Sequence, residues 1–239
     1  MSPKVVRAQA RAAFCILGVP RLARTIVYID GFNLYYRALK GTPYKWLDVV
    51  ALSQAALPST CQIEAVKYYT ARVSGRVDAT APARQHAYLR ALATLPKVSI
   101  HYGNFFVTQK WAGLVQPPEF RPIMTVPAGQ NPQVAYIWKT EEKGSDVNLG
   151  VHLVRDAFRG DFDQAAVITN DTDLVEPIRI VTQELGLPVT LLTPTGKPAT
   201  SLADVASYVR HVQPYVGPCQ LPSLIPVPGK KPIVKPPTW

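Results

Sequence analysis

Five short apolar segments alternate with stretches of helical periodicity along this chain. The apolar segments are residues 25–29, 64–72, 98–102, 164–169 and 189–193, and β-branched residues are frequent in them. Helical patterns occupy residues 33–40, 46–57, 81–95, 144–158 and 174–185. Continuously apolar strands that alternate with helices are typical of a parallel sheet covered on both faces. The sequence therefore predicts an α/β fold with a central, mostly parallel, five-stranded sheet flanked by helices.

Three segments lie outside this alternation. Residues 104–140 are rich in proline, glycine and aromatic residues, which predicts a hairpin-like excursion with residues 134–138 as one of its strands. Residues 1–24 carry five basic residues and no acid, and we interpret them as a basic N-terminal arm. Residues 214–239 contain eight prolines and three lysines, which predicts an extended C-terminal tail. The folded domain is therefore expected to span residues 25–213.

The net charge of +10 is distributed unevenly. Residues 37–140 contain twelve basic and four acidic residues, whereas residues 141–216 contain six basic and eleven acidic residues. A basic half beside an acidic half suggests a polyanion that is held against carboxylates. An ordinary solvated surface with two charged tails is the alternative.

Cysteine and hydropathy exclude several classes of protein. The three cysteines are far apart and form no CxxC motif, so a disulfide scaffold or a zinc ribbon is not expected. Free thiols are typical of a reducing compartment, and we therefore expect a cytoplasmic protein. No apolar run reaches the 18 or so residues that a membrane helix needs, so no membrane association is expected.

Four aspartates follow predicted strands or begin a predicted helix. Asp30 follows the first strand, Asp171 and Asp173 follow the fourth, and Asp146 begins the helix before that strand. The carboxyl ends of parallel strands meet at one edge of a sheet, where ligands bind in open α/β folds. The sequence therefore predicts that these four carboxylates form one cluster. Each of them alone also fits a turn or a helix cap.

Clustered carboxylates remain ionised together only if cations neutralise them; otherwise one of them takes up a proton. Oxygen ligands without nearby histidine or cysteine suit Mg²⁺ or Mn²⁺. Such a site can activate water and stabilise charge during displacement at a phosphodiester.

Three sequence stretches resemble the NYN domain, a member of the PIN-like, 5′-nuclease-like group. They are VYIDGFNLYY at residues 27–36, EEKGSDVNLGVHLVRDA at 141–157 and VITNDTDLVEPIRIVTQELGLPV at 167–189. The resemblance implies a three-layer PIN-like domain and a metal-dependent ribonuclease. It assigns catalysis and metal binding to the four aspartates, with Thr169 where the family usually has serine.

The resemblance and the residues together suggest further roles. Asn33, Thr169, Asn170 and Thr172 are expected to position a phosphate or the metal ligands, and Lys143 to offset phosphate charge. RNA is the expected partner. A homodimer and a protein partner for the proline-rich tail are left open.

Two other functions remain as alternatives at this point. One is a non-catalytic module that binds RNA or protein. The other is a phosphatase-like or receiver-like domain in which Asp30 accepts a phosphoryl group.

Overall fold

The centre of the molecule is a six-stranded sheet in the order β3-β2-β1-β6-β7-β8, in which all neighbouring strands are parallel. The computed structural model describes residues 22–239 apart from 77, 117, 120–131 and 238. The strands are β1 (Ala23–Asp30), β2 (Cys61–Thr70), β3 (Val98–Tyr102), β6 (Gln164–Ile168), β7 (Val189–Thr193) and β8 (Tyr208–His211). The predicted α/β class and parallel sheet are confirmed.

The prediction of five strands is wrong by one, because β8 was not expected. All four residues of β8 are exposed, since it lies at the edge of the sheet beside β7. An exposed edge strand does not need the continuous apolar run that identifies the other strands in the sequence, so β8 carries no such pattern.

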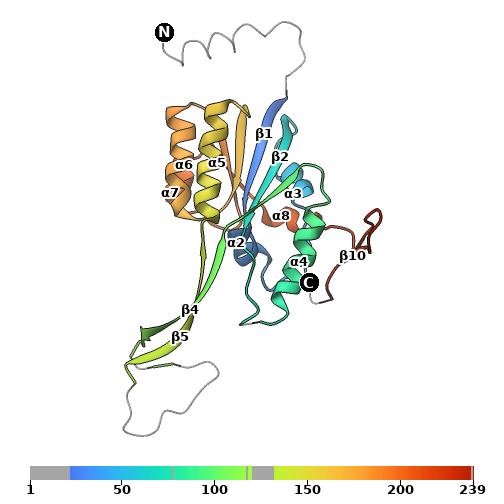
Figure 1. Cartoon of the computed structure of the whole chain (residues 1–239). Helices are drawn as coiled ribbons and strands as arrows, with labels where there is room; N and C mark the ends of the chain where they lie inside the picture. The colour runs from blue at the N-terminus through green and yellow to red at the C-terminus, as the bar shows by residue number, and fades with distance from the viewer. Residues whose placement is uncertain (1–21, 77, 117, 120–131, 238) are drawn as a thin grey trace, which may run out of the picture.

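Helices cover both faces of the sheet, which gives three layers. As Figure 1 shows, α5, α6 and α7 lie together on one face, and α3, α4 and α8 lie on the other. The helices are α2 (Gly31–Leu34), α3 (Val49–Ala56), α4 (Ala81–Leu92), α5 (Ser145–Arg159), α6 (Val175–Arg179), α7 (Thr200–Val205) and α8 (Gln213–Val216). Wider π-helical turns extend α2 through residues 35–39 and α6 through residues 180–184.

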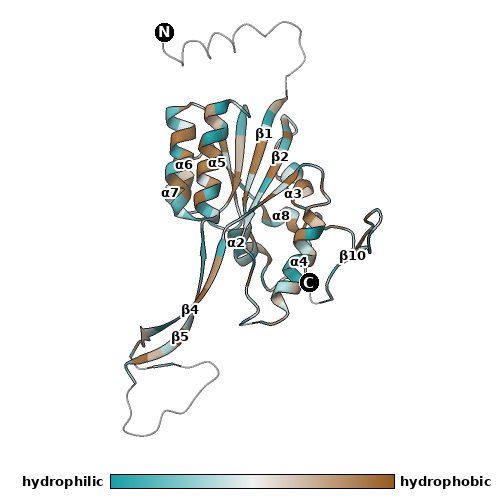
Figure 2. Cartoon of the chain, viewed as in Figure 1, coloured by the Kyte–Doolittle hydropathy of each residue, from teal (hydrophilic) through white to brown (hydrophobic). Residues whose placement is uncertain are grey.

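The central strand β1 contributes to both hydrophobic cores. Val27 and Ile29 pack into the core beneath α3 and α4, whereas Ile26 and Tyr28 pack into the core beneath α5 and α6. Side chains alternate between the two faces of a strand, so a strand covered on both faces must be apolar throughout. Figure 2 shows the resulting hydrophobic colouring of the central strands.

The predicted hairpin-like excursion is confirmed. Strands β4 (Asn104–Gly113) and β5 (Val134–Lys143) form an antiparallel two-stranded sheet that is separate from the central sheet. Gly103 lies at its base, where a Cβ atom would come within 2.4 Å of Glu142 Oε1. Glycine therefore allows β3, β4 and β5 to approach one another closely at this point.

The C-terminal segment is packed against the domain, which corrects the expectation of an extended tail at residues 214–239. Strands β9 (Leu224–Ile225) and β10 (Ile233–Val234) pair with each other, and Ile233 is 4% exposed. The indole Nε1 of Trp46 donates a hydrogen bond to the carbonyl of Pro222 at 2.9 Å, and the Trp239 ring lies 6.2 Å from that of Trp46. This proline-rich segment therefore contributes Leu221 and Ile233 to the hydrophobic core.

The N-terminal arm predicted at residues 1–24 lies almost entirely outside the described residues. Its last two residues belong to β1, where Arg24 forms a salt bridge to Asp163 at 3.0 Å. Across the described part of the chain, the helices are too short or too polar to cross a bilayer.

Neighbouring residues of β10 provide a test of this C-terminal packing. We expect Ile233→Ala to lower the free energy of unfolding by about 2–4 kcal/mol, because it leaves a cavity in the core. Val234 is 58% exposed, so Val234→Ala should cost less than about 0.5 kcal/mol. Urea unfolding of both variants measures the difference. Equal and small losses would show that the C-terminal segment does not pack as described.

Candidate active site

Strands β1 and β6 lie side by side at the point where the winding of the sheet reverses. From β1 the chain continues to β2 and β3 on one side, and then crosses to β6, β7 and β8 on the other. Ligands of open α/β sheets bind at the carboxyl ends of the strands, in the crevice at this reversal. Asp30 ends β1 and residues 169–173 follow β6, so both segments line that crevice.

Asp30 is a buried carboxylate with both oxygens in use. It is 3% exposed, its Oδ1 accepts a hydrogen bond from the Asn33 backbone N–H at 2.9 Å, and its Oδ2 accepts one from Thr169 Oγ1 at 3.1 Å. The following residue must be small, because a Cβ on Gly31 would lie 2.7 Å from the Tyr68 ring. The chain can therefore turn directly from β1 into α2 beneath the aspartate.

Two asparagines hold the loops of this site together. Asn33 Oδ1 accepts from the Asn170 backbone N–H at 3.0 Å, and Asn170 Oδ1 accepts from the Ala199 backbone N–H at 2.8 Å. Thr169 Oγ1 accepts from the Asp171 backbone N–H at 3.0 Å. Sequence reasoning expected these side chains near a phosphate. In the structure, Asn33 joins the loop after β1 to the loop after β6, and the Asn170 side chain joins the loop after β6 to the residue before α7.

Asp146 lies in the first turn of α5, which begins after Gly144. Gly144 has a φ of 96°, a left-handed conformation that favours glycine. Glu142 Oε1 accepts a hydrogen bond from the Ser145 backbone N–H at 3.0 Å, so Glu142 caps this helix from the end of β5. The positive end of the helix dipole also favours a carboxylate at this position.

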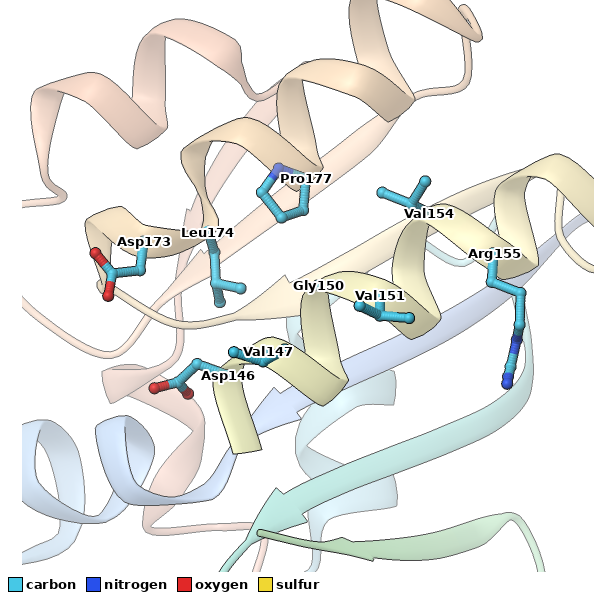
Figure 3. A pocket seen from close by; sticks show the side chains of 9 residues that line it. All are labelled: Asp146, Val147, Gly150, Val151, Val154, Arg155, Asp173, Leu174 and Pro177. Atoms are coloured by element: carbon cyan, nitrogen blue, oxygen red, sulfur yellow. The ribbon is translucent and has the colours of Figure 1, made fainter. Parts of the chain in front are cut away.

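Asp171 and Asp173 occupy the loop that follows β6. Asp171 Oδ1 accepts from the Asp173 backbone N–H at 3.0 Å, which fixes the turn leading into α6. Asp173 is exposed, and Figure 3 shows its carboxylate at the same end of a groove as that of Asp146.

Burial and mutual repulsion raise the pKa values of two of these aspartates. Burial raises the pKa of Asp30 to about 7, opposed by its hydrogen bond from Asn33 and reinforced by the charges of Asp146 and Asp171. Burial raises the pKa of Asp146 to about 6, and the charges of Glu142, Asp171 and Asp173 add to the rise. We call these four aspartates the aspartate cluster: the charges of Asp146 and Asp171 act on Asp30, and those of Asp171 and Asp173 act on Asp146.

The donor set of this cluster suits a hard divalent cation. Within the described residues, no three histidine, cysteine or acidic side chains stand close enough to hold an ion by themselves. Mg²⁺ does not need such a cage, because it commonly binds one or two carboxylates and keeps several waters. A cation would also offset the cost of burying ionised Asp30 and Asp146, together with the repulsion from neighbouring carboxylates that adds to it. These residues therefore fit Mg²⁺ or Mn²⁺ coordinated partly by water or substrate.

The remaining predicted residues lie at the rim of the cluster. Lys143 ends β5 with 66% of its side chain exposed, and its Nζ is 3.8 Å from Glu141 Oε2. Thr172 is exposed at the start of the short helical turn after Asp171. Both side chains are accessible to a ligand that lies over the crevice.

Sequence reasoning missed two neighbours of the site. Glu142 lies in the stretch at residues 141–157 that resembles the NYN domain. Its position just before Gly144 and Asp146 is the one sign in the sequence that it lies near the site. Tyr68 is buried in the core, where the charge of Asp30 adds to the effect of burial in raising its pKa. Nothing in the strand pattern of β2 distinguishes Tyr68 from other core residues.

An apolar groove of about 570 Å³ begins beside the cluster and runs between α5 and α6 (Figure 3). Asp146 and Asp173 lie at one end of the groove and Arg155 at the other. Gly150 and Pro177 form the contact between the helices, since a Cβ on Gly150 would lie 2.8 Å from Pro177 Cγ. Val147 and Val151 line the groove and are more than half exposed.

Comparison with known families agrees with the motifs and with the geometry of this site. Residues 24–213 match the model of the NYN domain. The chain belongs to the NYN domain family. This NYN domain includes the whole six-stranded sheet and all four aspartates. Membership places the chain in a nuclease-like family.

Two individual proteins are similar to this NYN chain. It is 32% identical to the 6-hydroxy-3-succinoylpyridine 3-monooxygenase HspA of Pseudomonas putida (strain DSM 28022 / S16), over 90% of this chain and 75% of that protein. A crystal structure of a Vibrio parahaemolyticus protein of unknown function is similar in fold, with a TM-score of 0.50 and 14% identity. That likeness covers 82% of this chain and 96% of the other.

The raised pKa of Asp30 predicts a pH-dependent effect of Asp30→Asn in the ion-free protein. The folded chain keeps the Asp30 proton up to about pH 7, whereas an unfolded aspartate loses it near pH 4. The folded state binds more protons between these values, so its stability falls as pH rises through them. We expect Asp30→Asn to remove this loss and to stabilise the protein by roughly 2–4 kcal/mol at about pH 8, but little at about pH 4.

Urea unfolding in the presence of a chelator measures this effect. Asp161→Asn is the matched control. Asp161 is exposed in the turn between α5 and β6, at the amino ends of the strands and away from the carboxyl ends where Asp30 lies. It should change the free energy of unfolding by less than about 0.5 kcal/mol. An Asp30→Asn variant no more stable than the wild type at either pH would contradict the assignment of Asp30 as a strained carboxylate.

Proposed function

We propose that this protein is an Mg²⁺- or Mn²⁺-dependent ribonuclease. The observation that carries the proposal is the electrostatic cluster of four aspartates at the reversal point of the sheet. Burial raises the pKa values of Asp30 and Asp146, repulsion from neighbouring carboxylates adds to the rise, and a bound cation would offset both effects. Membership of the NYN family supports the same reaction class.

Asp30, Asp146 and Asp171 would hold the cation directly or through water, and Asp173 would complete the acidic set. When bound, the cation supplies a more acidic water and neutralises charge on the phosphodiester. Thr169 and Asn33 keep the carboxylate of Asp30 in a single orientation through their hydrogen bonds. Lys143, which is exposed at the end of β5, would offset the charge of a phosphate near the cluster.

Cleavage of an end-labelled RNA tests the proposal. We expect the full chain to cleave the RNA with Mn²⁺ or Mg²⁺ and to stop when the ions are chelated. Asp30→Asn and Asp171→Asn should each reduce the single-turnover rate by about 100-fold or more, because each removes a charged ligand from the cluster.

Asp161→Asn is again the control, and it should cleave at the wild-type rate. Cleavage that persists in chelator, or in Asp30→Asn, would contradict the proposal. RNA that is bound without cleavage would instead indicate a non-catalytic module. A phosphorylated Asp30 after incubation with acetyl phosphate would indicate a phosphoacceptor domain.

The name of one relative supports a second candidate function, the hydroxylation of a substituted pyridine. HspA is 32% identical over most of both chains, and the apolar groove beside Asp146 has room for a small aromatic acid. Monooxygenation consumes dioxygen and two electrons, so its test supplies 6-hydroxy-3-succinoylpyridine, a nicotinamide reductant and air. Product formation coupled to reductant oxidation would favour this function. Their absence, alongside metal-dependent RNA cleavage, would favour the ribonuclease.

A further inference from the structure

The antiparallel hairpin of β4 and β5, here called the arm, adjoins the aspartate cluster at its base. Figure 1 shows the arm projecting away from the layers of the domain. It leaves the sheet just after the carboxyl end of β3 and returns at Lys143, three residues before Asp146. Asn104 and Lys143 are paired, so the arm begins and ends at the same edge of the sheet that carries the aspartates.

One face of the arm carries a row of exposed aromatic side chains, here called the aromatic face. The register pairs Trp111 with Tyr136 and Gln109 with Trp138, and paired residues share a face of a hairpin. Trp111 is 68% exposed, Tyr136 55% and Trp138 51%, and the Trp111 and Tyr136 rings are 5.1 Å apart. Large rings this exposed on a projecting hairpin mark an interaction surface.

The row of rings continues from the arm to the aspartate cluster. Phe105 lies on the same face near the base of the arm, with its ring 6.4 Å from that of Phe32. The Phe32 ring is in turn 6.4 Å from that of Tyr36, which is 56% exposed. These three rings are nearly parallel, with angles of 27° and 17° between successive planes. Phe32 lies in α2, the helix that begins directly after Asp30, so these rings lie on the segment that follows the buried carboxylate.

Cationic side chains lie over these rings. Arg76 is 4.9 Å from the centre of the Trp138 ring, and Lys40 is 4.9 Å from that of Tyr36. In the part of the chain that the structure describes, neither cation forms an ion pair with an acid. Their positive charge therefore remains available to an anionic partner.

Exposed rings beside unpaired cations are what a single-stranded nucleic acid requires. Its bases stack on aromatic side chains while its phosphates contact basic groups. A duplex cannot use such a surface in the same way, because its base faces are stacked on one another. A second protein chain would also account for the rings and for Arg76, because aromatic residues and arginine are enriched at protein interfaces. Lys40 over Tyr36 and the position of the arm next to the aspartates favour an anionic polymer instead, and the experiment below distinguishes the two.

We infer that the aromatic face, together with Phe32 and Tyr36, binds single-stranded RNA by base stacking and leads the strand to the aspartate cluster. The inference rests on the proposed function for the identity of the polymer as RNA. It adds the strandedness of the substrate and a binding surface outside the aspartate cluster.

Fluorescence anisotropy of a labelled oligouridylate of about 15 nucleotides tests the inference with the full chain in chelator, where no cleavage intervenes. Trp111→Ala and Trp138→Ala should each weaken binding by about tenfold, because each removes a stacking platform. Trp138→Phe should restore most of the affinity. An oligonucleotide with the same number of phosphates but abasic sites should bind the wild type more weakly than either alanine variant binds oligouridylate, because it can stack on none of the rings.

Phe106→Ala is the matched control. Phe106 is 47% exposed on the same strand but on the opposite face, so its removal should leave RNA affinity unchanged. Unchanged binding by both tryptophan variants, equal binding of the abasic oligonucleotide, or no binding by the wild type would each overturn the inference. So would a shift of the free protein from dimer to monomer in the variants with unaltered RNA binding, which would identify the face as a contact between copies.

The outcomes for this inference and for the proposed function are separable. Metal-dependent cleavage at the wild-type rate in both tryptophan variants, with unchanged binding, would retain the ribonuclease and reject the aromatic face. Base-dependent binding through the tryptophans without cleavage in Mn²⁺ would retain the aromatic face and reject the ribonuclease.

Discussion

The buried carboxylate of Asp30 links the fold of this protein to its candidate active site. It terminates the central strand, and its hydrogen bonds from Asn33 and Thr169 connect the loop after β1 with the loop after β6. The same burial makes its ionised form costly while no cation is present. The fold thus holds a destabilised group in place at the point where a ligand can offset its cost. Functional sites commonly reduce stability in this way.

Much of this arrangement could be predicted from the sequence, because burial on both faces leaves an unmistakable pattern. Strands β1 and β7 are mostly buried and rich in apolar residues, and the aspartates lie at a strand end, in the loop after a strand or in the first turn of a helix. Residues whose role depends on distant partners could not be predicted. Glu142 caps α5 only because the arm returns beside Gly144, and β8 is an edge strand without an apolar run. The prolines after residue 213 suggested an extended chain, yet Leu221 and Ile233 fill the core beside Trp46.

The comparisons combine a nuclease-like family with a relative that is named for oxygenation of a pyridine. One fold can support different reactions, so the site decides between them. The carboxylates and the apolar groove meet at Asp146, where the positive end of α5 faces the crevice. Polyanion chemistry would use the acidic end of this region, whereas a small aromatic substrate would use the apolar groove. The ribonuclease and the monooxygenase would therefore bind their substrates at different, neighbouring surfaces of α5.

The arm is a separate hairpin that the central sheet does not need. Its strands pair only with each other, and all five ladders of the central sheet form without them. Because Asn104 and Lys143 are already adjacent, a short turn could join them without moving β3 or α5. The entropy of loop closure changes slowly with loop length, so arms of many lengths are compatible with one stable domain. Changes in the arm could therefore alter which ligand the domain binds without altering the four aspartates.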